Sequence, residues 1–264
     1  MHFYLSLLLL SSLVVFEVWS LSSLAAQQQE RQDPAILVMF DSSNHWHRDL
    51  VYHPEQPERI TKCVQAIIRT SGNLSGVKLV NVAPADQQQQ EEEEKEESGK
   101  DSSRQELLLP VSKEPFSKEQ LEYARQILIQ THTPDLVSKL EERSQASKQQ
   151  RLAEGKVALG HMGYLDTGDT YVTTESFGVC VRAAAAWIRG VDTILQQGTS
   201  SNFDCFAMAL TRPPGHHATK TNSNGFCIYN FAAATALHIL SSSYENSMKV
   251  AILDWDVHYG QGVA

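Results

Sequence analysis

The apolar residues of the chain follow two spacings, and their alternation predicts the fold. Continuous apolar runs of about four to eight residues are typical of strands buried on both faces. Such runs predict strands at residues 35–40, 77–82, 203–210 and 249–255. Apolar positions at helical spacing predict helices at residues 57–70, 117–128, 177–195 and 231–240. Strands alternating with helices are typical of an α/β domain, in which a parallel sheet is covered by helices on both faces.

Local signals mark where some of these helices begin. Pro57 stands at an expected first helical position, where the N–H that proline lacks would be unpaired in any case. Ser117 and Gln120 have the spacing of a capping box. Thr133 followed by Pro134 predicts the start of a further helix. We therefore expect helices to begin close to these residues.

The first residues differ from the rest of the chain. Leu5 to Trp19 form an apolar run that is short for a transmembrane span, and small residues ending at Ala26 follow it. This order predicts a signal or targeting segment at residues 1–26. Glu17 interrupts the run and no Lys or Arg precedes it, so an uncleaved anchor or a mispredicted start is the alternative. The segment favours the secretory route or an organelle such as a plastid, with the nucleus or cytoplasm as the alternative.

A polar stretch interrupts the predicted domain, which spans residues 35–264. Residues 86–105 contain no apolar side chain and are rich in Gln and Glu. Such a stretch buries too little surface to offset its chain entropy, so we expect a disordered surface insertion. Residues 91–97 supply six of the acids behind the formal charge of −9. An acidic balance argues against direct binding of nucleic acid.

The cysteines do not form a metal-binding or disulfide pattern. They stand far apart, without a CxxC pair, at Cys63, Cys180, Cys205 and Cys227. Each lies among apolar residues, which indicates small buried side chains.

Two of the predicted strands end in residues that can carry chemistry. The strand at 203–210 is followed by Arg212-Pro213-Pro214-Gly215-His216-His217, and the run KVAIL (249–253) is followed by Asp254, Asp256 and His258. Sites in open α/β folds gather at the carboxyl ends of strands. Since side chains alternate along a strand, we expect the two aspartates and His258 on one side and Trp255 and Val257 packed on the other.

A carboxylate and an imidazole on one face are suitable ligands for zinc or a similar divalent ion. A catalytic zinc usually has three protein ligands and an open position for water. The tandem histidines could then serve as acid and base beside that water. Taken alone, an Asp-x-Asp-x-His segment could be a capped strand end, and a histidine pair in a loop is more often solvated than catalytic.

Together these segments resemble the zinc-dependent histone deacetylases and the bacterial acetylpolyamine amidohydrolases, which share an arginase-like α/β fold. The resemblance runs from Ala35 to the last residue and is closer to class II and bacterial members than to class I. The segments that carry it are HPEQPERI (53–60), HTPDLV (132–137), GDTYVTTES (168–176), RPPGHHA (212–218), GFCIYN (225–230) and DWDVHYGQG (254–262).

The resemblance implies a catalytic centre. His217 would be the main general base and then acid, while His216 acts with Asp254 as an electrostatic partner. Asp256 and His258 would be zinc ligands. The family likeness also implies a structural monovalent cation near Asp254 and Asp256.

The same resemblance implies a substrate channel. Asp169 would be the rim aspartate that grips the substrate backbone. Gly225 and Phe226 would line a narrow hydrophobic channel that fits an acetyl-lysine-like chain. Arg59 would lie beneath the active site, at the acetate channel.

The chain also departs from the family. Tyr259 stands where a second histidine is usual, and Gln261 stands where Asn or Asp usually hydrogen-bonds the second catalytic histidine. Gln261 keeps the acceptor group but adds a methylene, so His217 could be badly oriented. The chain ends before the family's third zinc ligand and its oxyanion tyrosine, so we expect the sheet to be incomplete at the C-terminus and turnover to be feeble or absent.

The first hypothesis for the function is zinc-dependent hydrolysis of acetyl-lysine amides in proteins. The alternatives are the same chemistry on acetylated polyamines or other small molecules, and an inactive binding module or gene-model fragment. The partner is thus an acetylated protein lysine or another acetylated amine. The sequence does not specify an oligomeric state.

Overall fold

The computed structural model describes ten stretches of the chain. They are residues 3–10, 13–19, 36–49, 53–71, 77–84, 111–156, 159–165, 168–198, 206–242 and 248–264. The predicted insertion at 86–105 and Cys205 lie outside these stretches.

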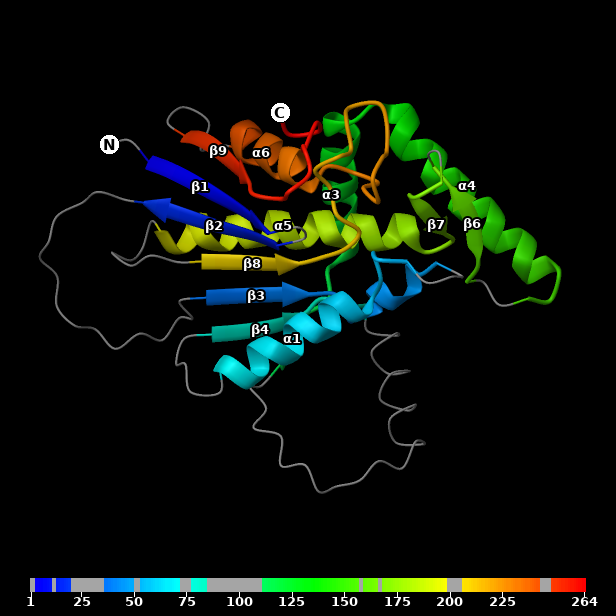
Figure 1. Ribbon diagram of the computed structural model, residues 1–264, viewed down its shortest axis with the longest axis horizontal. Helices are drawn as coiled ribbons and strands as arrows, with labels where there is room; N and C mark the ends of the chain where they lie inside the picture. Colours follow the sequence, from blue (N-terminus) through cyan, green and yellow to red (C-terminus); the bar gives the residue numbers. More distant parts are fainter. Residues whose placement is uncertain are drawn as a thin grey trace, which may run out of the picture.

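One half of the main sheet is a run of parallel strands (Figure 1). Its order is β5 (Val111–Lys113), β4 (Val77–Asn81), β3 (Ile36–Phe40) and β8 (Phe206–Leu210). The pairs β5–β4, β4–β3 and β3–β8 are all parallel. The carboxyl ends of these strands therefore meet at one edge of the sheet, where the tandem histidines follow β8.

The other half of the sheet contains the N-terminal residues. Beyond β8 the order continues β2 (Leu13–Trp19), β1 (Phe3–Leu10) and β9 (Met248–Asp254). Strand β2 pairs antiparallel with β8 and with β1, and β1 pairs parallel with β9. A continuous apolar run has the composition of a buried strand as well as that of a targeting segment. Removal of residues 1–26 as a targeting segment stays a prediction.

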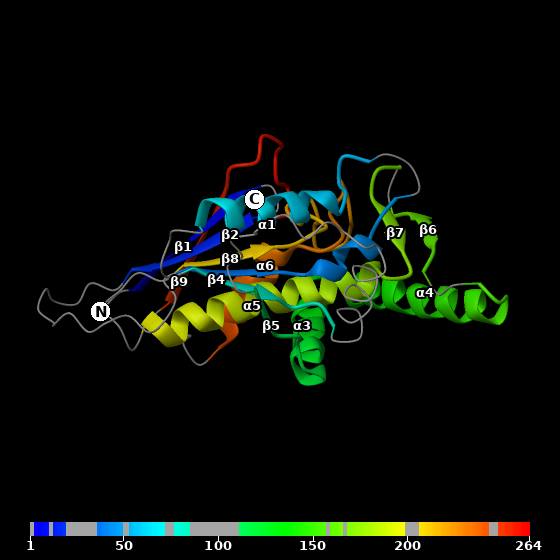
Figure 2. The same ribbon diagram turned by 90° about the horizontal axis from the view of Figure 1, so that it is seen from below.

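Helices cover both faces of the sheet, as expected. Helix α1 (Glu58–Ser71) lies on one face, and α5 (Ser176–Gly198) lies on the other with α3 (Lys118–Thr131) and α6 (Phe231–Ser241) (Figure 2). Strand β3 joins two apolar clusters, because its side chains alternate. Leu37 and Met39 pack in the cluster that contains α5, whereas Val38 and Phe40 pack with α1. The α/β class and the parallel sheet are confirmed.

The helix starts follow the sequence signals closely. Ser117 caps α3 in a complete capping box with Gln120. Helix α4 (Pro134–Ala153) begins after Thr133, although the Thr133 side chain makes no capping hydrogen bond. Pro57 stands just before α1 instead of inside it.

Some features were not expected from the sequence. A short 3-10 helix, η1 (Ser42–Trp46), follows β3, and a two-stranded sheet pairs β6 (His161–Tyr164) with β7 (Tyr171–Thr173). Cys180 and Cys227 are buried, but Cys63 is exposed on α1, so the expectation of burial is wrong there. None of the helices in the described stretches is long and apolar enough to cross a membrane.

Candidate active site

The tandem histidines are held by partners from the C-terminal loop. His216 Nδ1 lies 2.8 Å from Asp254 Oδ2, and His217 Nδ1 lies 2.8 Å from Gln261 Oε1. Both partner atoms are acceptors, so each imidazole carries a proton on Nδ1 and donates it. In the neutral rings the Nε2 atoms are then free of a proton. The ring centroids are 4.0 Å apart, and His216 Nε2 lies 3.9 Å from Asp256 Oδ1.

Gln261 compensates for its extra methylene. The sequence suggested that His217 could be badly oriented by a longer partner. The Gln261 amide oxygen nevertheless reaches His217 Nδ1 at an ordinary hydrogen-bond distance, and the Gly262 N–H donates to the His216 carbonyl at 2.8 Å. The C-terminal loop thus binds the tandem-histidine loop through both backbone and side chain.

Two glycines allow these loops to approach closely. A Cβ on Gly225, whose φ is +53°, would meet His217 Cδ2 at 2.5 Å. A Cβ on Gly260 would collide with the Asp254 carboxylate and lie 3.0 Å from His216 Nδ1. Any side chain at either position would displace the histidine beside it.

Asp256 and His258 converge, but for a different reason from the one expected. Strand β9 ends at Asp254, so strand alternation does not reach His258. A tight turn brings the two side chains together, because Asp256 Oδ1 accepts hydrogen bonds from the His258 N–H and from His258 Nδ1, each at 2.8 Å. Burial acts to raise the pKa of Asp256, but these bonds and the nearby imidazoles outweigh it and lower that pKa. The carboxylate is therefore ionised at neutral pH.

These two side chains carry the atom types of a partial metal-ligand set. A carboxylate oxygen and an imidazole nitrogen are zinc donors, and here they point at each other. Among the residues that the structure describes, no group of three or more His, Cys, Asp or Glu side chains is arranged to hold a metal ion. A further ligand would have to come from outside this set.

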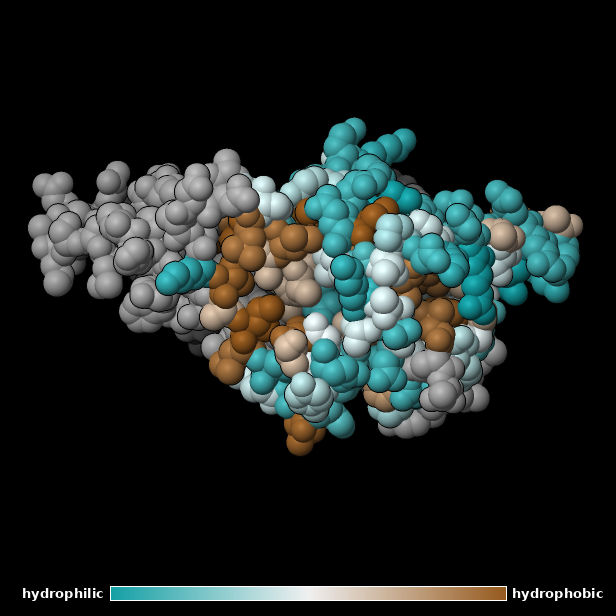
Figure 3. Space-filling view, turned by 90° about the horizontal axis from the view of Figure 1, so that it is seen from above, coloured by the Kyte–Doolittle hydropathy of each residue, from teal (hydrophilic) through white to brown (hydrophobic). Residues whose placement is uncertain are grey.

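The residues that alternate with Asp256 and His258 do not pack inward. Trp255 is 41% exposed and Val257 is 91% exposed, so the expectation that they face the core is wrong. The turn after Asp254 removes them from the strand. The neighbouring Tyr259 is 75% exposed, and Figure 3 shows apolar side chains on the outer surface of this part of the molecule.

The predicted rim and channel residues lie together. Phe226 has a positive φ of 69°, which is rare for a side chain of its size, and its N–H donates to Thr170 Oγ1 at 3.0 Å. Thr170 follows the exposed Asp169, and its hydroxyl also contacts Asp169 Oδ1 at 3.2 Å. Gly225 and Phe226 are thus joined to the segment of Asp169, the predicted rim aspartate. Strained backbone of this kind is common at ligand sites.

A buried ion pair that the sequence did not reveal supports the tandem-histidine loop. Arg212 is fully buried and donates from Nε and Nη2 to the two oxygens of Glu55, at 2.6 and 2.7 Å. The hydroxyl of Tyr171 donates to Glu55 Oε2 at 2.9 Å. Arg59 Nη1 lies 3.9 Å from Glu55 Oε1, so the predicted channel arginine borders this pair.

The electrostatics of this group keep it charged despite burial. Burial acts to raise the pKa of Glu55, but the Arg212 charge and the hydrogen bond from His47 outweigh it and hold that pKa well below its usual value. Burial, followed by the Glu55 charge, raises the pKa of Tyr171 far above its usual value. The phenol therefore stays protonated and donates.

His132 holds the far end of the same loop. Its Nδ1 lies 2.9 Å from the Thr219 carbonyl, and its Nε2 accepts from the Asn230 N–H at 2.9 Å. Burial lowers the pKa of His132, so the ring is neutral at neutral pH. Asn230 in turn caps α6 and donates from its side chain to the Ala218 carbonyl at 3.2 Å.

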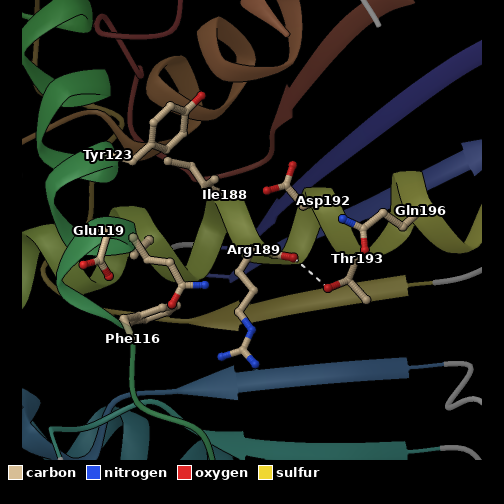
Figure 4. A pocket seen from close by; sticks show the side chains of 10 residues that line it. Phe116, Glu119, Tyr123, Ile188, Arg189, Asp192, Thr193 and Gln196 are labelled. Carbon is tan, nitrogen blue, oxygen red and sulfur yellow. Dashed lines mark hydrogen bonds between the residues drawn. The ribbon is translucent and has the colours of Figure 1, made fainter. Parts of the chain in front are cut away.

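A separate hollow of about 430 Å³ lies between α3 and α5 (Figure 4). Several of its polar side chains are engaged: Thr193 donates to the Arg189 carbonyl, and Tyr123 and Asp192 both bind His238. None of its lining residues belongs to the candidate site.

These features define a class of protein. An α/β sheet presents paired imidazoles and two candidate metal ligands at the carboxyl ends of its strands, which is typical of metal-dependent hydrolases. The family model described as Histone deacetylase domain matches residues 53–264. The chain therefore belongs to the histone deacetylase family, whose members are in general zinc-dependent.

Individual relatives agree with this assignment. The chain is 36% identical over 95 residues to the polyamine deacetylase HDAC10 of Danio rerio. The aligned residues make up 36% of this chain and 13% of that protein. It is 31% identical over 135 residues to histone deacetylase 6 of Caenorhabditis elegans, covering 46% of this chain and 14% of that protein.

A solved structure supports the fold. The HD domain of HDA15 aligns with 86% of this chain at a TM-score of 0.52 and 24% sequence identity. The chain spans 48% of that domain and a smaller share of the two relatives. The activity, substrates and partners of the whole protein are therefore proposals.

Proposed function

We propose that this protein hydrolyses the acetyl amide of an acetylated amine with the help of a zinc ion. The observation that carries the proposal is the pair of fixed imidazoles, each with its Nδ1 2.8 Å from an acceptor oxygen. Family membership supports the same chemistry.

The two imidazoles are suited to different roles. Asp254 is a carboxylate and stabilises a positive charge on the His216 ring, whereas Gln261 offers His217 only a neutral amide oxygen. His216 therefore acts with Asp254 as an electrostatic partner of the reacting carbonyl. His217 Nε2 accepts a proton from the attacking water and then gives it to the departing amine.

Zinc would be held by Asp256 and His258 together with a further ligand, and when bound it supplies a Lewis acid that polarises the carbonyl and acidifies water. Asp169 would bind the backbone or amine of the substrate from the rim. Phe226 would contact its aliphatic chain.

The substrate class is the finer part of the proposal. An acetylated protein lysine is the first candidate, because the family resemblance implies a narrow channel beside Phe226 that would fit an extended acetyl-lysine side chain. An acetylated polyamine is the second, since one relative carries the name polyamine deacetylase and another the name histone deacetylase.

The test measures acetate release from an acetyl-lysine peptide and from an acetylated polyamine, with and without zinc. We expect His217→Ala to lower the zinc-dependent rate by about a hundredfold or more, because general acid–base catalysis contributes at least that factor. Bound zinc should be unchanged in this variant. His45→Ala, which removes an exposed imidazole, is the matched control. The departures from the family predict a low rate, so the assay must detect slow release, and the absence of zinc-dependent release from both substrates would refute the proposal.

A further inference from the structure

His53 lies between two candidate substrate residues that come from different loops. Its Nε2 is 3.1 Å from the Asp169 carbonyl oxygen. Its ring stands edge-on to the Phe226 ring, with centroids 4.6 Å apart and planes at 75°. A single imidazole thus contacts both the rim segment and the channel wall.

The hydrogen bonds of His53 select one tautomer. The Asp169 carbonyl can only accept, so Nε2 must carry the proton for that bond. The Glu55 N–H can only donate, and it reaches His53 Nδ1 at 3.1 Å. Both bonds are satisfied together by a neutral ring with its proton on Nε2. The longer approach of Nδ1 to the Glu55 carbonyl, at 3.3 Å, would need a proton on Nδ1 instead.

The support behind His53 is rigid. Glu55 is buried and is fixed by two hydrogen bonds from Arg212 and one from Tyr171. The Tyr171 ring also meets the His53 ring edge-on, with centroids 5.0 Å apart. The buried ion pair therefore holds His53 in place, and His53 in turn holds the Asp169 segment.

We infer that His53 is a positioning residue that fixes the Asp169 segment and the Phe226 ring at one spacing, and so sets how the acetylated substrate is bound. The inference rests on the proposed function. No hydrogen bond or ring contact within the described stretches joins His53 to either tandem histidine. Its loss should therefore weaken substrate binding and leave proton transfer at His217 unchanged.

Two substitutions separate the hydrogen bonds of the ring. His53→Gln places an amide N–H close to the position of Nε2 and keeps a donor for the Asp169 carbonyl. His53→Asn offers an oxygen close to the position of Nδ1 and loses that donor. A typical hydrogen bond corresponds to about a fivefold effect on an equilibrium. We expect His53→Asn to raise KM about fivefold with kcat within about twofold, and His53→Gln to restore KM to within about twofold of the wild-type value.

The experiment combines zinc-dependent kinetics with imidazole NMR of the wild-type protein, and the NMR spectrum should show a neutral His53 with its proton on Nε2. An unchanged KM in His53→Asn, a fall in kcat instead, or a proton on Nδ1 would each overturn the inference while leaving the proposed function in place. An absence of zinc-dependent turnover in the wild-type protein would refute the proposed function, and the inference with it.

Discussion

The residues behind the tandem histidines are almost sealed from solvent, whereas the residues around the candidate metal ligands are largely exposed. Arg212, Glu55 and Tyr171 are each no more than 2% exposed, and they bind one another through several hydrogen bonds. The His258 side chain is 71% exposed and is flanked by Val257 and Tyr259, which are more exposed still.

The difference shows that the described residues preorganise proton transfer at the tandem histidines more than metal binding at Asp256 and His258. The orientation of both imidazoles is set by hydrogen bonds to the partly buried Asp254 and Gln261, so proton transfer needs little rearrangement. The turn that carries Asp256 and His258 is held mainly by hydrogen bonds within itself. Its geometry would therefore respond more to the binding of a metal ion and to contacts made by the exposed side chains.

The largest effect should come from breaking the buried ion pair. Arg212→Met leaves the Glu55 carboxylate buried without its cation, and we expect the free energy of unfolding to fall by about 3–5 kcal/mol. Arg48→Met breaks the exposed ion pair with Glu58 and should cost less than about 1 kcal/mol. Urea denaturation of the two variants measures the contrast. Equal losses in the free energy of unfolding would mean that the buried Arg212–Glu55 pair contributes no more to stability than the exposed Arg48–Glu58 pair.

The second prediction concerns the exposed turn that carries Asp256 and His258. Asp256→Asn replaces a charged candidate ligand with a neutral amide. Loss of a residue that only hydrogen-bonds a metal ligand weakens metal binding roughly tenfold, and we expect the loss of zinc affinity here to be larger. His217→Ala should leave zinc binding unchanged. Asp135→Asn, at an exposed aspartate paired with Lys139, controls for the loss of a charge. Calorimetric titration with zinc is the measurement, and equal affinity in the Asp256 and Asp135 variants would contradict the ligand assignment.

The third prediction uses two buried histidines. Burial lowers the pKa of His47 and of His132 in the folded chain. Below about pH 6.5 the unfolded chain binds protons on these residues while the folded chain does not. The free energy of unfolding should therefore fall as pH is lowered from 7.5 to 5.5. The Glu55 contribution is lost only at lower pH, below the usual range of a glutamate.

Denaturation curves at several pH values test this dependence. His132→Gln removes one of the two titrating groups and should flatten the slope between pH 7.5 and 5.5. His45→Gln, at an exposed histidine, should keep the wild-type slope. A stability that does not change over this range would show that the buried rings accept protons in the folded state.

The parts that could be predicted from sequence are those with a local signal. Apolar periodicity located β3, β4, β8 and the long helix α5, because each buries a face with a regular spacing. The tandem histidines and their partners Asp254 and Gln261 were found from motifs, and the structure brings them within hydrogen-bond distance.

The buried support of the site gave no such signal. Glu55 and Arg212 are separated by 157 positions in the chain, and no spacing rule connects them. His53 and His132 stand in the motifs HPEQPERI and HTPDLV, but the sequence predicted no role for either residue. Their partners are mostly backbone groups, whose positions depend on the tertiary fold.

The turn after β9 shows where a correct rule was extended too far. Alternation holds along a strand, but β9 ends at Asp254, and from there hydrogen bonds to the two aspartates set the direction of the chain. The convergence of Asp256 and His258 was thus predicted for the wrong reason, and the burial of Trp255 and Val257 was predicted wrongly.

The smallest effect should come from the most exposed apolar residue of this turn. Val257 is so exposed that Val257→Ser removes almost no packing, and the free energy of unfolding should change by no more than about 0.5 kcal/mol. Val191→Ser places a hydroxyl from α5 into the core and should cost several times as much. Urea denaturation of both variants compares the two regions directly. If Val257→Ser destabilised the protein as strongly as Val191→Ser, the turn would be packed in solution, and the candidate metal ligands would be as firmly held as the tandem histidines.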